Sequence, residues 1–240
     1  MQNLITAENL RSFAYCNNAI CRMPVRGIVI EFFGLGNTSM FWDDTDAGKF
    51  YAEQGILFLV PYNNPWAWMN RQAVAFTDEL VDLLFEQYSL PENTPIVSTG
   101  GSMGGLAALI YTAYAKRTPK ACVANCPVCD LPYHFTERPD LPRTLYSAFW
   151  NYECTMDEAL RATSPLHLAR AGKMPDVKYT VFHCTADKAV NKDMHSERFL
   201  AAMTSRRIDY RIVKDRGHCD LTPEMWKEYR AAAVSAVENA

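Results

Sequence analysis

The sequence predicts an α/β protein with a mostly parallel sheet and helices on both faces of that sheet. Several segments are continuously apolar, which is typical of strands that helices cover on both sides. Segments with the periodicity of amphipathic helices separate them along the chain, and this alternation is typical of parallel strands joined by right-handed crossovers. A hydrophobic content of 49% and a charged content of 21% suit a chain with a sizeable buried core.

Six short, mainly apolar segments are expected to form the buried strands. In chain order they are RGIVIEFF (26–33), ILFLVPY (56–62), PIVST (95–99), KACVANC (120–126), KYTVFHC (178–184) and DYRIVKD (209–215). The first of these strands runs into the glycine-rich loop GLGN.

Five helices are expected between and after these strands. The clearest is the second, in which apolar residues recur every four positions at Phe76, Leu80, Leu84 and Tyr88. The expected ranges are 46–54, 73–88, 103–117, 192–204 and 223–238.

Two segments depart from this rhythm. SFAYCNNAICRM (12–23) predicts a β-hairpin with Asn17 and Asn18 at the turn. Residues 130–165 are too many for a simple loop and predict a small, lid-like helical excursion over one edge of the functional site. No linker-like composition interrupts the chain, so we expect one domain over residues 1–240.

Charge and cysteine content narrow the possible partners and location. The net charge is −3 without a basic block, so nucleic acid is not an expected partner. No apolar segment is long enough to cross a bilayer, and the N-terminus lacks a secretory pattern, so we expect no membrane association and a cytoplasmic location. The eight cysteines are expected to be free thiols. Nothing in the sequence indicates the oligomeric state.

The stretch STGGSMGGLAAL (98–109) contains the pattern G-x-S-x-G at Gly100, Ser102 and Gly104. The pattern lies between an expected strand and an expected helix. A serine in such a sharp turn needs small neighbours, because other parts of the backbone pass close by. We therefore expect Ser102 to be a nucleophile held above the sheet edge. A phosphate-binding loop is disfavoured, because G-x-x-x-x-G-K-[ST] is absent and G-x-G-x-x-G does not open the first βαβ unit.

A serine nucleophile needs a base, and the base needs an acid that orients it. For a serine on such a turn, the acid and then the histidine follow along the chain. His218 alone lies in a loop after the last strand, so it is the expected base. Asp187 follows the preceding strand and is the expected acid, with Asp193 as the second choice. His183 is expected in the core and His195 on an exposed helix.

Further residues are expected to stabilise the reaction or bind the substrate. The N–H groups of Met103 and Leu35 are the expected donors to the oxyanion of a tetrahedral intermediate. Trp66 and Trp68 follow the carboxyl end of a strand, where ligands bind in such sheets, and His134 lies in the excursion. We expect these three side chains to bind substrate. The two tryptophans are expected to form a platform for a sugar or an aromatic acyl group. Alternatively, one tryptophan packs beneath the excursion.

Four segments together resemble a known family: GGSMGG, ATSPLHLA, HCTADKAV and RGHCD. They resemble the α/β-hydrolase fold and, within it, the catalytic domain of prolyl oligopeptidase-type serine hydrolases and esterases. The resemblance implies that Ser102 is the nucleophile, Asp187 the orienting acid and His218 the base. The chain departs from the family where Phe33-Gly34 replaces a frequent His-Gly pair. It also lacks the β-propeller of larger members, so peptidase activity does not carry over.

The expected function is that of a serine hydrolase that cleaves small carboxylic esters through an acyl-enzyme, without a metal or cofactor. A small peptidase or amidase with the same triad is the alternative, and a ligand-binding domain without activity is the third possibility. Cys122, Cys126 and Cys129 have the spacing of an iron–sulfur site but are interpreted as buried thiols. The charged, proline-broken excursion favours short acyl groups over long ones.

Overall fold

A computed structural model of the 240-residue chain describes residues 5–205 and 207–239. The seven strands of the described part form one sheet in the order β1-β3-β2-β4-β5-β6-β7. The strands are β1 (Ala14–Cys16), β2 (Gly27–Phe32), β3 (Ile56–Pro61), β4 (Ile96–Gly101), β5 (Ala121–Asn125), β6 (Lys178–Cys184) and β7 (Ile208–Val213). Strand β1 is antiparallel to β3, and the other neighbouring pairs are parallel. The mostly parallel sheet is therefore confirmed, and its six expected strands are β2 to β7.

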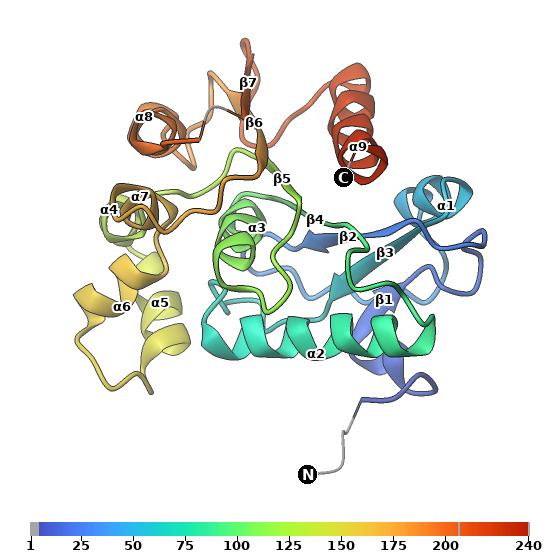
Figure 1. Cartoon of the computed structure of the whole chain (residues 1–240). Helices are drawn as coiled ribbons and strands as arrows, with labels where there is room; N and C mark the ends of the chain where they lie inside the picture. The colour runs from blue at the N-terminus through green and yellow to red at the C-terminus, as the bar shows by residue number, and fades with distance from the viewer. Residues whose placement is uncertain (1–4, 206, 240) are drawn as a thin grey trace.

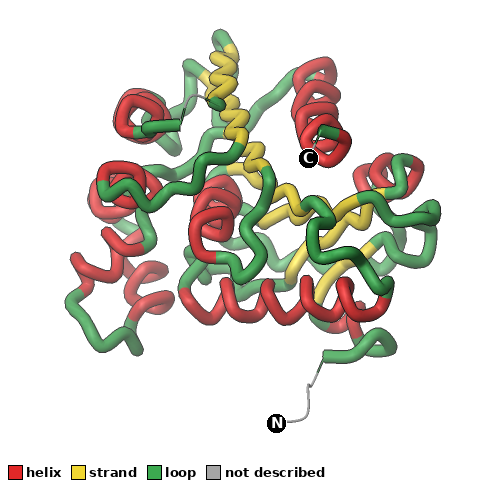
Figure 2. Tube along the Cα trace, in the orientation of Figure 1, coloured by secondary structure: helices red, strands yellow, loops and turns green. Residues whose placement is uncertain are grey.

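Helices cover both faces of the sheet (Figure 1, Figure 2). Helices α2 and α3 pack on one face, and α1 and α9 pack on the other. A π-helical turn (Asp193–Glu197) leads into α8. The helices outside the excursion are α1 (Asp46–Glu53), α2 (Arg71–Gln87), α3 (Met103–Tyr114), α8 (Arg198–Ala202) and α9 (Pro223–Glu238).

Polar side chains mark where three of these helices begin. Thr45, Asn70 and Thr222 each accept a hydrogen bond from a backbone N–H group of the first turn, at the starts of α1, α2 and α9. Such caps satisfy donors that have no partner within the helix. The start of α3 differs, because its capping residue is Ser102 and its side chain makes no capping hydrogen bond. That hydroxyl is therefore free for another partner.

The excursion between β5 and β6 is helical, as the sequence predicts. Its helices lie together beside the sheet, to the left in Figure 1. They are α4 (Leu131–Glu137), α5 (Leu141–Phe149), α6 (Met156–Ala162) and α7 (Pro165–Arg170). Asp130 caps α4 by accepting a hydrogen bond from the N–H group of Tyr133. The excursion thus starts directly at the carboxyl edge of β5.

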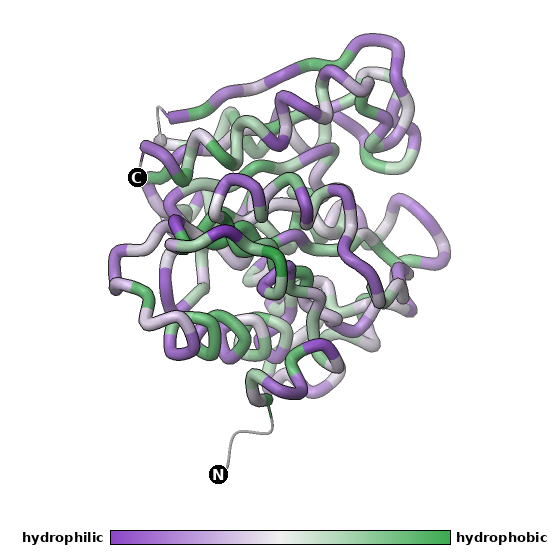
Figure 3. Tube along the Cα trace, turned by 90° about the vertical axis from the view of Figure 1, so that its right-hand side faces the viewer, coloured by the Kyte–Doolittle hydropathy of each residue, from purple (hydrophilic) through white to green (hydrophobic). Residues whose placement is uncertain are grey.

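Two apolar cores lie on the two faces of the sheet. Along β2, Ile28 and Ile30 belong to the core beneath α2 and α3, while Val29 belongs to the core beneath α1 and α9. Figure 3 shows that hydrophobic and hydrophilic residues alternate along the helices that cover these cores. No helix in the described ranges is long and apolar enough to span a bilayer. All eight cysteines lie in these ranges, and each is a free thiol.

The hairpin expected over 12–23 is wrong. Strand β1 pairs with β3 instead, and no strand follows it before β2. The side chain of Asn17 explains the difference, because it connects other parts of the chain. Its amide donates to the carbonyls of Gly48 and Ile56 at 2.9 and 3.1 Å, and its oxygen accepts from Phe58 N–H at 2.8 Å.

Candidate active site

The turn between β4 and α3 holds Ser102 in an unusual backbone conformation. Its φ is 59° and its ψ is −124°, values that a side chain-bearing residue adopts only when its surroundings enforce them. The Ser102 N–H donates to the carbonyl of Asn125 on β5 at 2.9 Å, and the Ser102 carbonyl accepts from Leu106 N–H at 3.1 Å. Main-chain contacts therefore fix the turn and leave the hydroxyl exposed to the site.

Two glycines of the G-x-S-x-G pattern are required by close packing of the backbone. A Cβ atom at Gly100 would overlap the carbonyl of Gly104, and a Cβ atom at Gly104 would overlap the carbonyl of Phe32. The neighbouring strand β2 thus runs directly against the start of α3. This arrangement is a sharp strand-to-helix turn with the geometry expected for the G-x-S-x-G pattern.

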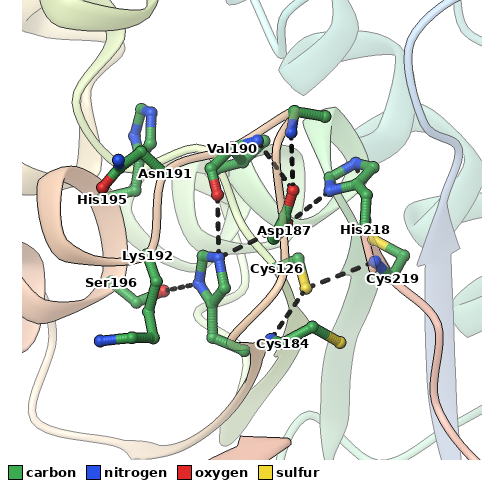
Figure 4. Close-up of polar contacts among 12 residues, drawn as sticks. Cys126, Cys184, Asp187, Val190, Asn191, Lys192, His195, Ser196, His218 and Cys219 are labelled. Atoms are coloured by element: carbon green, nitrogen blue, oxygen red, sulfur yellow. Dashed lines mark hydrogen bonds and ion pairs between the residues drawn. The ribbon is translucent and has the colours of Figure 1, made fainter. Parts of the chain in front are cut away.

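Ser102, His218 and Asp187 form one hydrogen-bonded chain. His218 Nε2 lies 2.8 Å from Ser102 Oγ, and His218 Nδ1 lies 2.7 Å from Asp187 Oδ2. Figure 4 shows the contact between Asp187 and His218, which come from the loops after β6 and β7. Because a carboxylate only accepts hydrogen bonds, the Nδ1 proton faces Asp187 and the Nε2 lone pair faces Ser102.

The carboxylate of Asp187 is fully buried and is held by its own turn. Its Oδ1 accepts hydrogen bonds from the N–H groups of Ala189 and Val190 at 2.8 and 3.0 Å. Burial alone would raise the pKa of Asp187, but hydrogen bonds from His183, His218 and Val190 outweigh burial and hold this pKa well below its usual range. Asp187 is therefore charged at neutral pH.

Asp193, the second choice for the acid, lies elsewhere. Its side chain is 77% exposed and pairs with Lys192 at 2.6 Å. It makes no hydrogen bond to His218 within the described residues. The geometry therefore favours Asp187 as the partner of the imidazole.

The charge of Asp187 also acts on His218. Burial disfavours the imidazolium, but the hydrogen bond and charge of Asp187 raise the pKa of His218 to about 9. Cys126 would raise the pKa of His218 only if its thiol were deprotonated. Its contact with Cys219 and its burial raise the pKa of the Cys126 thiol, so it stays neutral and the carboxylate dominates. The Cys126 sulfur instead accepts the N–H groups of Cys184 and Cys219, both at 3.4 Å (Figure 4).

Ser102 and His218 lie in a cavity of about 450 Å³. Leu35 and His134 also line this cavity. The Leu35 N–H donates to no group in the part of the chain that the structure describes, so it is free to bind an oxyanion. Met103 directly follows Ser102 at the first position of α3.

The two tryptophans have different surroundings. Trp68 is buried and lines the cavity, and its Nε1 donates to Thr144 Oγ1 of α5 at 3.0 Å. It therefore packs beneath the excursion and also faces the site. Trp66 does not line this cavity but borders a separate one.

Among the cavity residues that were not expected from the sequence, three have ionisable side chains: Glu31, Arg138 and Cys219. Glu31 is the one charged residue of β2, and a single charge in an otherwise apolar strand is a signal in the sequence that could have marked it as a site residue. Burial raises the pKa of Glu31 to about 7, although the hydrogen bond from Thr99 opposes this shift. Cys219 Sγ lies 3.8 Å from His218 Nε2.

A second cluster, His134–Glu137–His195, adjoins the cavity. His195 is fully buried, so the expectation that it is exposed is wrong. Its Nδ1 accepts the N–H groups of Cys129 and Asp130, both at 3.1 Å. The proton therefore sits on Nε2, which donates to Glu137 at 2.9 Å.

Glu137 also fixes the tautomer of His134. Burial would raise the pKa of Glu137, but hydrogen bonds from His134 and His195 outweigh it and lower this pKa to about 2. His134 Nδ1 contacts the same carboxylate, so the proton lies on Nδ1. Burial lowers the pKa of His134, which keeps the ring neutral. Its Nε2 lone pair makes no hydrogen bond within the described residues and can accept one from a substrate.

These tautomers also bear on metal binding. The three side chains of the second cluster lie close enough to hold an ion. However, a histidine ligand normally donates its other ring N–H to an acceptor, whereas His195 Nδ1 accepts from two donors. The cluster is therefore arranged for hydrogen bonding rather than for holding a metal ion.

The three cysteines with iron–sulfur spacing do not converge. Cys122 and Cys129 pack in the core beneath α2 and α3, while Cys126 packs in the core on the opposite face of the sheet. All three are buried. Their sulfur atoms therefore do not face a common point.

Comparison with known proteins places this geometry in a family. A family model described as the prolyl oligopeptidase family matches residues 68–235. No curated protein matches the chain in sequence. A solved puromycin hydrolase is similar with a TM-score of 0.68 and 18% identity, over 89% of this chain and 34% of that one. The chain thus spans about a third of the length of that hydrolase.

Two other solved structures are similar over most of their own length. An S-formylglutathione hydrolase from Agrobacterium tumefaciens matches with a TM-score of 0.68 and 16% identity, over 88% of this chain and 83% of that one. A monoacylglycerol lipase from Paleococcus ferrophilus matches with a TM-score of 0.61 and 16% identity, over 95% of this chain and 99% of that one. At these identities the likeness shows the fold alone.

The sheet, the serine turn and these neighbours together show the α/β-hydrolase fold. The family model covers more than half of the chain. The chain therefore belongs to the prolyl oligopeptidase family.

Proposed function

We propose that this protein is a serine hydrolase that cleaves small carboxylic esters through an acyl-enzyme. The observation that carries the proposal is the continuous hydrogen-bonded chain Ser102–His218–Asp187 in the 450 Å³ cavity. A buried, charged acid, an imidazole with its lone pair toward the serine and a strained serine turn are the parts that acyl transfer needs. No step of this mechanism requires a metal or cofactor.

In this mechanism Ser102 Oγ attacks the ester carbonyl while His218 Nε2 takes its proton. The negative charge that forms on the carbonyl oxygen is stabilised by the Met103 and Leu35 N–H groups. His218 then protonates the departing alcohol. In the second half, His218 activates a water molecule that releases the acid, and Asp187 stabilises the imidazolium in both halves.

The substrate is held by the remaining walls of the cavity. Trp68, which is fully buried, supports this wall from behind, and His134 Nε2 accepts a hydrogen bond from an O–H or N–H group of the substrate. The S-formylglutathione hydrolase and the monoacylglycerol lipase, which the chain matches over most of their length, support an ester substrate. Family membership favours a second candidate, a small peptidase or amidase with the same triad.

Covalent labelling and paired substrates test the proposal. A fluorophosphonate probe should label Ser102 in the folded protein, as intact-mass analysis and peptide mapping would show, and Ser102→Ala should remain unlabelled. Label on another serine would sink the triad, and no label on the folded protein would support a ligand-binding domain without activity. Hydrolysis of p-nitrophenyl butyrate should exceed that of alanyl-p-nitroanilide, and the reverse order would identify an amidase. A cytoplasmic location and a single domain over residues 1–240 remain part of the proposal.

A further inference from the structure

A second cavity, which we call the tryptophan cavity, lies between the loop after β3, the start of α2 and the end of α5. Its volume is about 540 Å³. None of the described residues that line it carries a charge. Trp66 and Trp150 border it and are 47% and 79% exposed. The other side chains on its wall that can form hydrogen bonds are Tyr62, Asn63, Asn64, Asn70, Gln72 and Ser147.

Several of these polar groups are free to bind a ligand. Asn63 and Ser147 make no side-chain hydrogen bond within the described residues. The oxygen of Asn64 accepts the Trp66 N–H at 2.9 Å, which leaves its NH₂ group free. Tyr62 Oη accepts Phe41 N–H at 2.9 Å, so its own proton is available. Amide and hydroxyl groups both donate and accept, as the hydroxyl groups of a sugar do.

The tryptophans fit the same chemistry. Large indole rings that stay exposed beside a cavity offer flat apolar surfaces that a ligand can cover. A pyranose ring has an apolar face of C–H groups that stacks on such a ring, while its hydroxyl groups reach the surrounding amides. A phosphate, carboxylate or ammonium group would find no opposite charge on this wall. A neutral oligosaccharide therefore fits the cavity better than an ionic ligand.

A small hollow of about 20 Å³ lies between the tryptophan cavity and the catalytic cavity. Phe33 and Gly34 line both this hollow and the catalytic cavity. Asn63, Asn64 and Ala67 line both the hollow and the tryptophan cavity. The shared lining residues therefore place the two cavities next to one another, on either side of this hollow.

We propose that the tryptophan cavity binds a neutral oligosaccharide and that the esters cleaved at Ser102 are acyl groups carried by such sugars. The sugar-binding part stands on the cavity alone, whereas the identity of the ester rests on the function proposed above. The acyl group occupies the catalytic cavity, and the sugar chain that bears it extends to the adjacent tryptophan cavity.

Direct binding tests the first part without any catalysis. The probes are xylotetraose, cellotetraose and mannotetraose, titrated into the wild-type protein by isothermal titration calorimetry. At least one should bind, and Trp150→Ala and Trp66→Ala should each weaken this binding by about tenfold or more. Trp42→Ala is the matched control, because Trp42 is 87% exposed and does not line the cavity. Absence of binding by all three sugars, or binding that neither substitution weakens, overturns the proposal.

Kinetics test the second part. For an acetylated form of the sugar that binds, Trp150→Ala should raise KM by about tenfold with little change in kcat. The same variant should hydrolyse p-nitrophenyl acetate like the wild type, because that ester does not reach the tryptophans. Unchanged KM for the acetylated sugar would contradict the proposed substrate class. If the wild type does not hydrolyse p-nitrophenyl acetate, that result would count against the proposed function instead. The calorimetry would still decide whether the tryptophan cavity binds a sugar.

Discussion

The Nε2 atom of His183 lies 3.5 Å from Asp187 Oδ2, the oxygen that also accepts the hydrogen bond from His218. His183 Nε2 is 3.1 Å from the Val190 carbonyl, which can only accept, so the ring proton lies on Nε2. The Ser196 hydroxyl lies 2.6 Å from His183 Nδ1 and donates to it. The proposed acid is therefore held between two histidines, one in the core and one facing the cavity.

Replacing the acid should preserve the fold and abolish most of the activity. In Asp187→Asn the amide lacks the charge that stabilises the imidazolium and can hold His218 in the wrong tautomer. We expect kcat to fall on the order of 10⁴-fold, as for this substitution in a serine-protease triad. Steady-state kinetics with p-nitrophenyl butyrate would measure the loss. Asp193→Asn is the matched control, and an inactive Asp193→Asn with an active Asp187→Asn would show that the acid is misassigned.

The pH dependence of kcat/KM should follow the deprotonation of His218. Only the neutral imidazole can take the Ser102 proton, so activity increases as pH rises through the pKa of His218. Asp187 raises this pKa from 6.5 toward about 9, and the midpoint should lie between these values. A profile from about pH 5 to about pH 10 would measure it. A midpoint below 6.5 would mean that Asp187 does not stabilise the imidazolium.

The tautomer of His134 should depend on Glu137. At neutral pH, ¹⁵N NMR of the wild type should show His134 neutral with its proton on Nδ1. Both rings contact Glu137 Oε2, and Glu137→Gln removes the negative charge of this shared acceptor, so the His134 signal should shift and KM should rise more than kcat falls. Glu153→Gln, an exposed change in the excursion, is the control. A proton on Nε2 in the wild type would sink the proposed acceptor role of His134.

Acyl-chain length should show an optimum at short chains. A buried CH₂ group gains about 0.8 kcal/mol only where the wall around it is apolar. The catalytic cavity instead includes Glu31, His134, Arg138 and His218. We expect kcat/KM for acetyl and butyryl p-nitrophenyl esters to exceed that for the palmitoyl ester. A steady increase beyond about eight carbons would show that a long apolar channel opens in solution.

Local sequence patterns were sufficient for the sheet and the serine turn. The apolar runs that became β2 to β6 are buried on both faces, so they carry the signal that distinguishes such strands, whereas the edge strand β7 is only half-buried. The G-x-S-x-G pattern was informative because a strand and a helix flank it. The positions of Asp187 and His218 followed from chain order alone, and the structure places both within hydrogen-bonding distance of their expected partners.

Features that depend on distant contacts could not be predicted in this way. Asn17 and Asn18 form a common turn pair, but Asn17 is used to connect α1 and β3. His195 follows polar residues and appeared exposed, because only the folded chain brings the backbone of Cys129 and Asp130 against its ring. Glu137, which lies 58 positions from His195, was missed for the same reason.

The turn that holds Asp187 also affects the barrier of the proton transfer. Its donors are main-chain N–H groups and a buried ring, so they already point at the carboxylate before substrate arrives. When His218 becomes positive, these dipoles do not have to rotate, as water molecules around a free imidazole would. Most of the reorganisation that the proton transfer requires has therefore already taken place when the chain folds. Substitutions that loosen residues 187–190 should slow the reaction even though none of the altered atoms takes part in bond making.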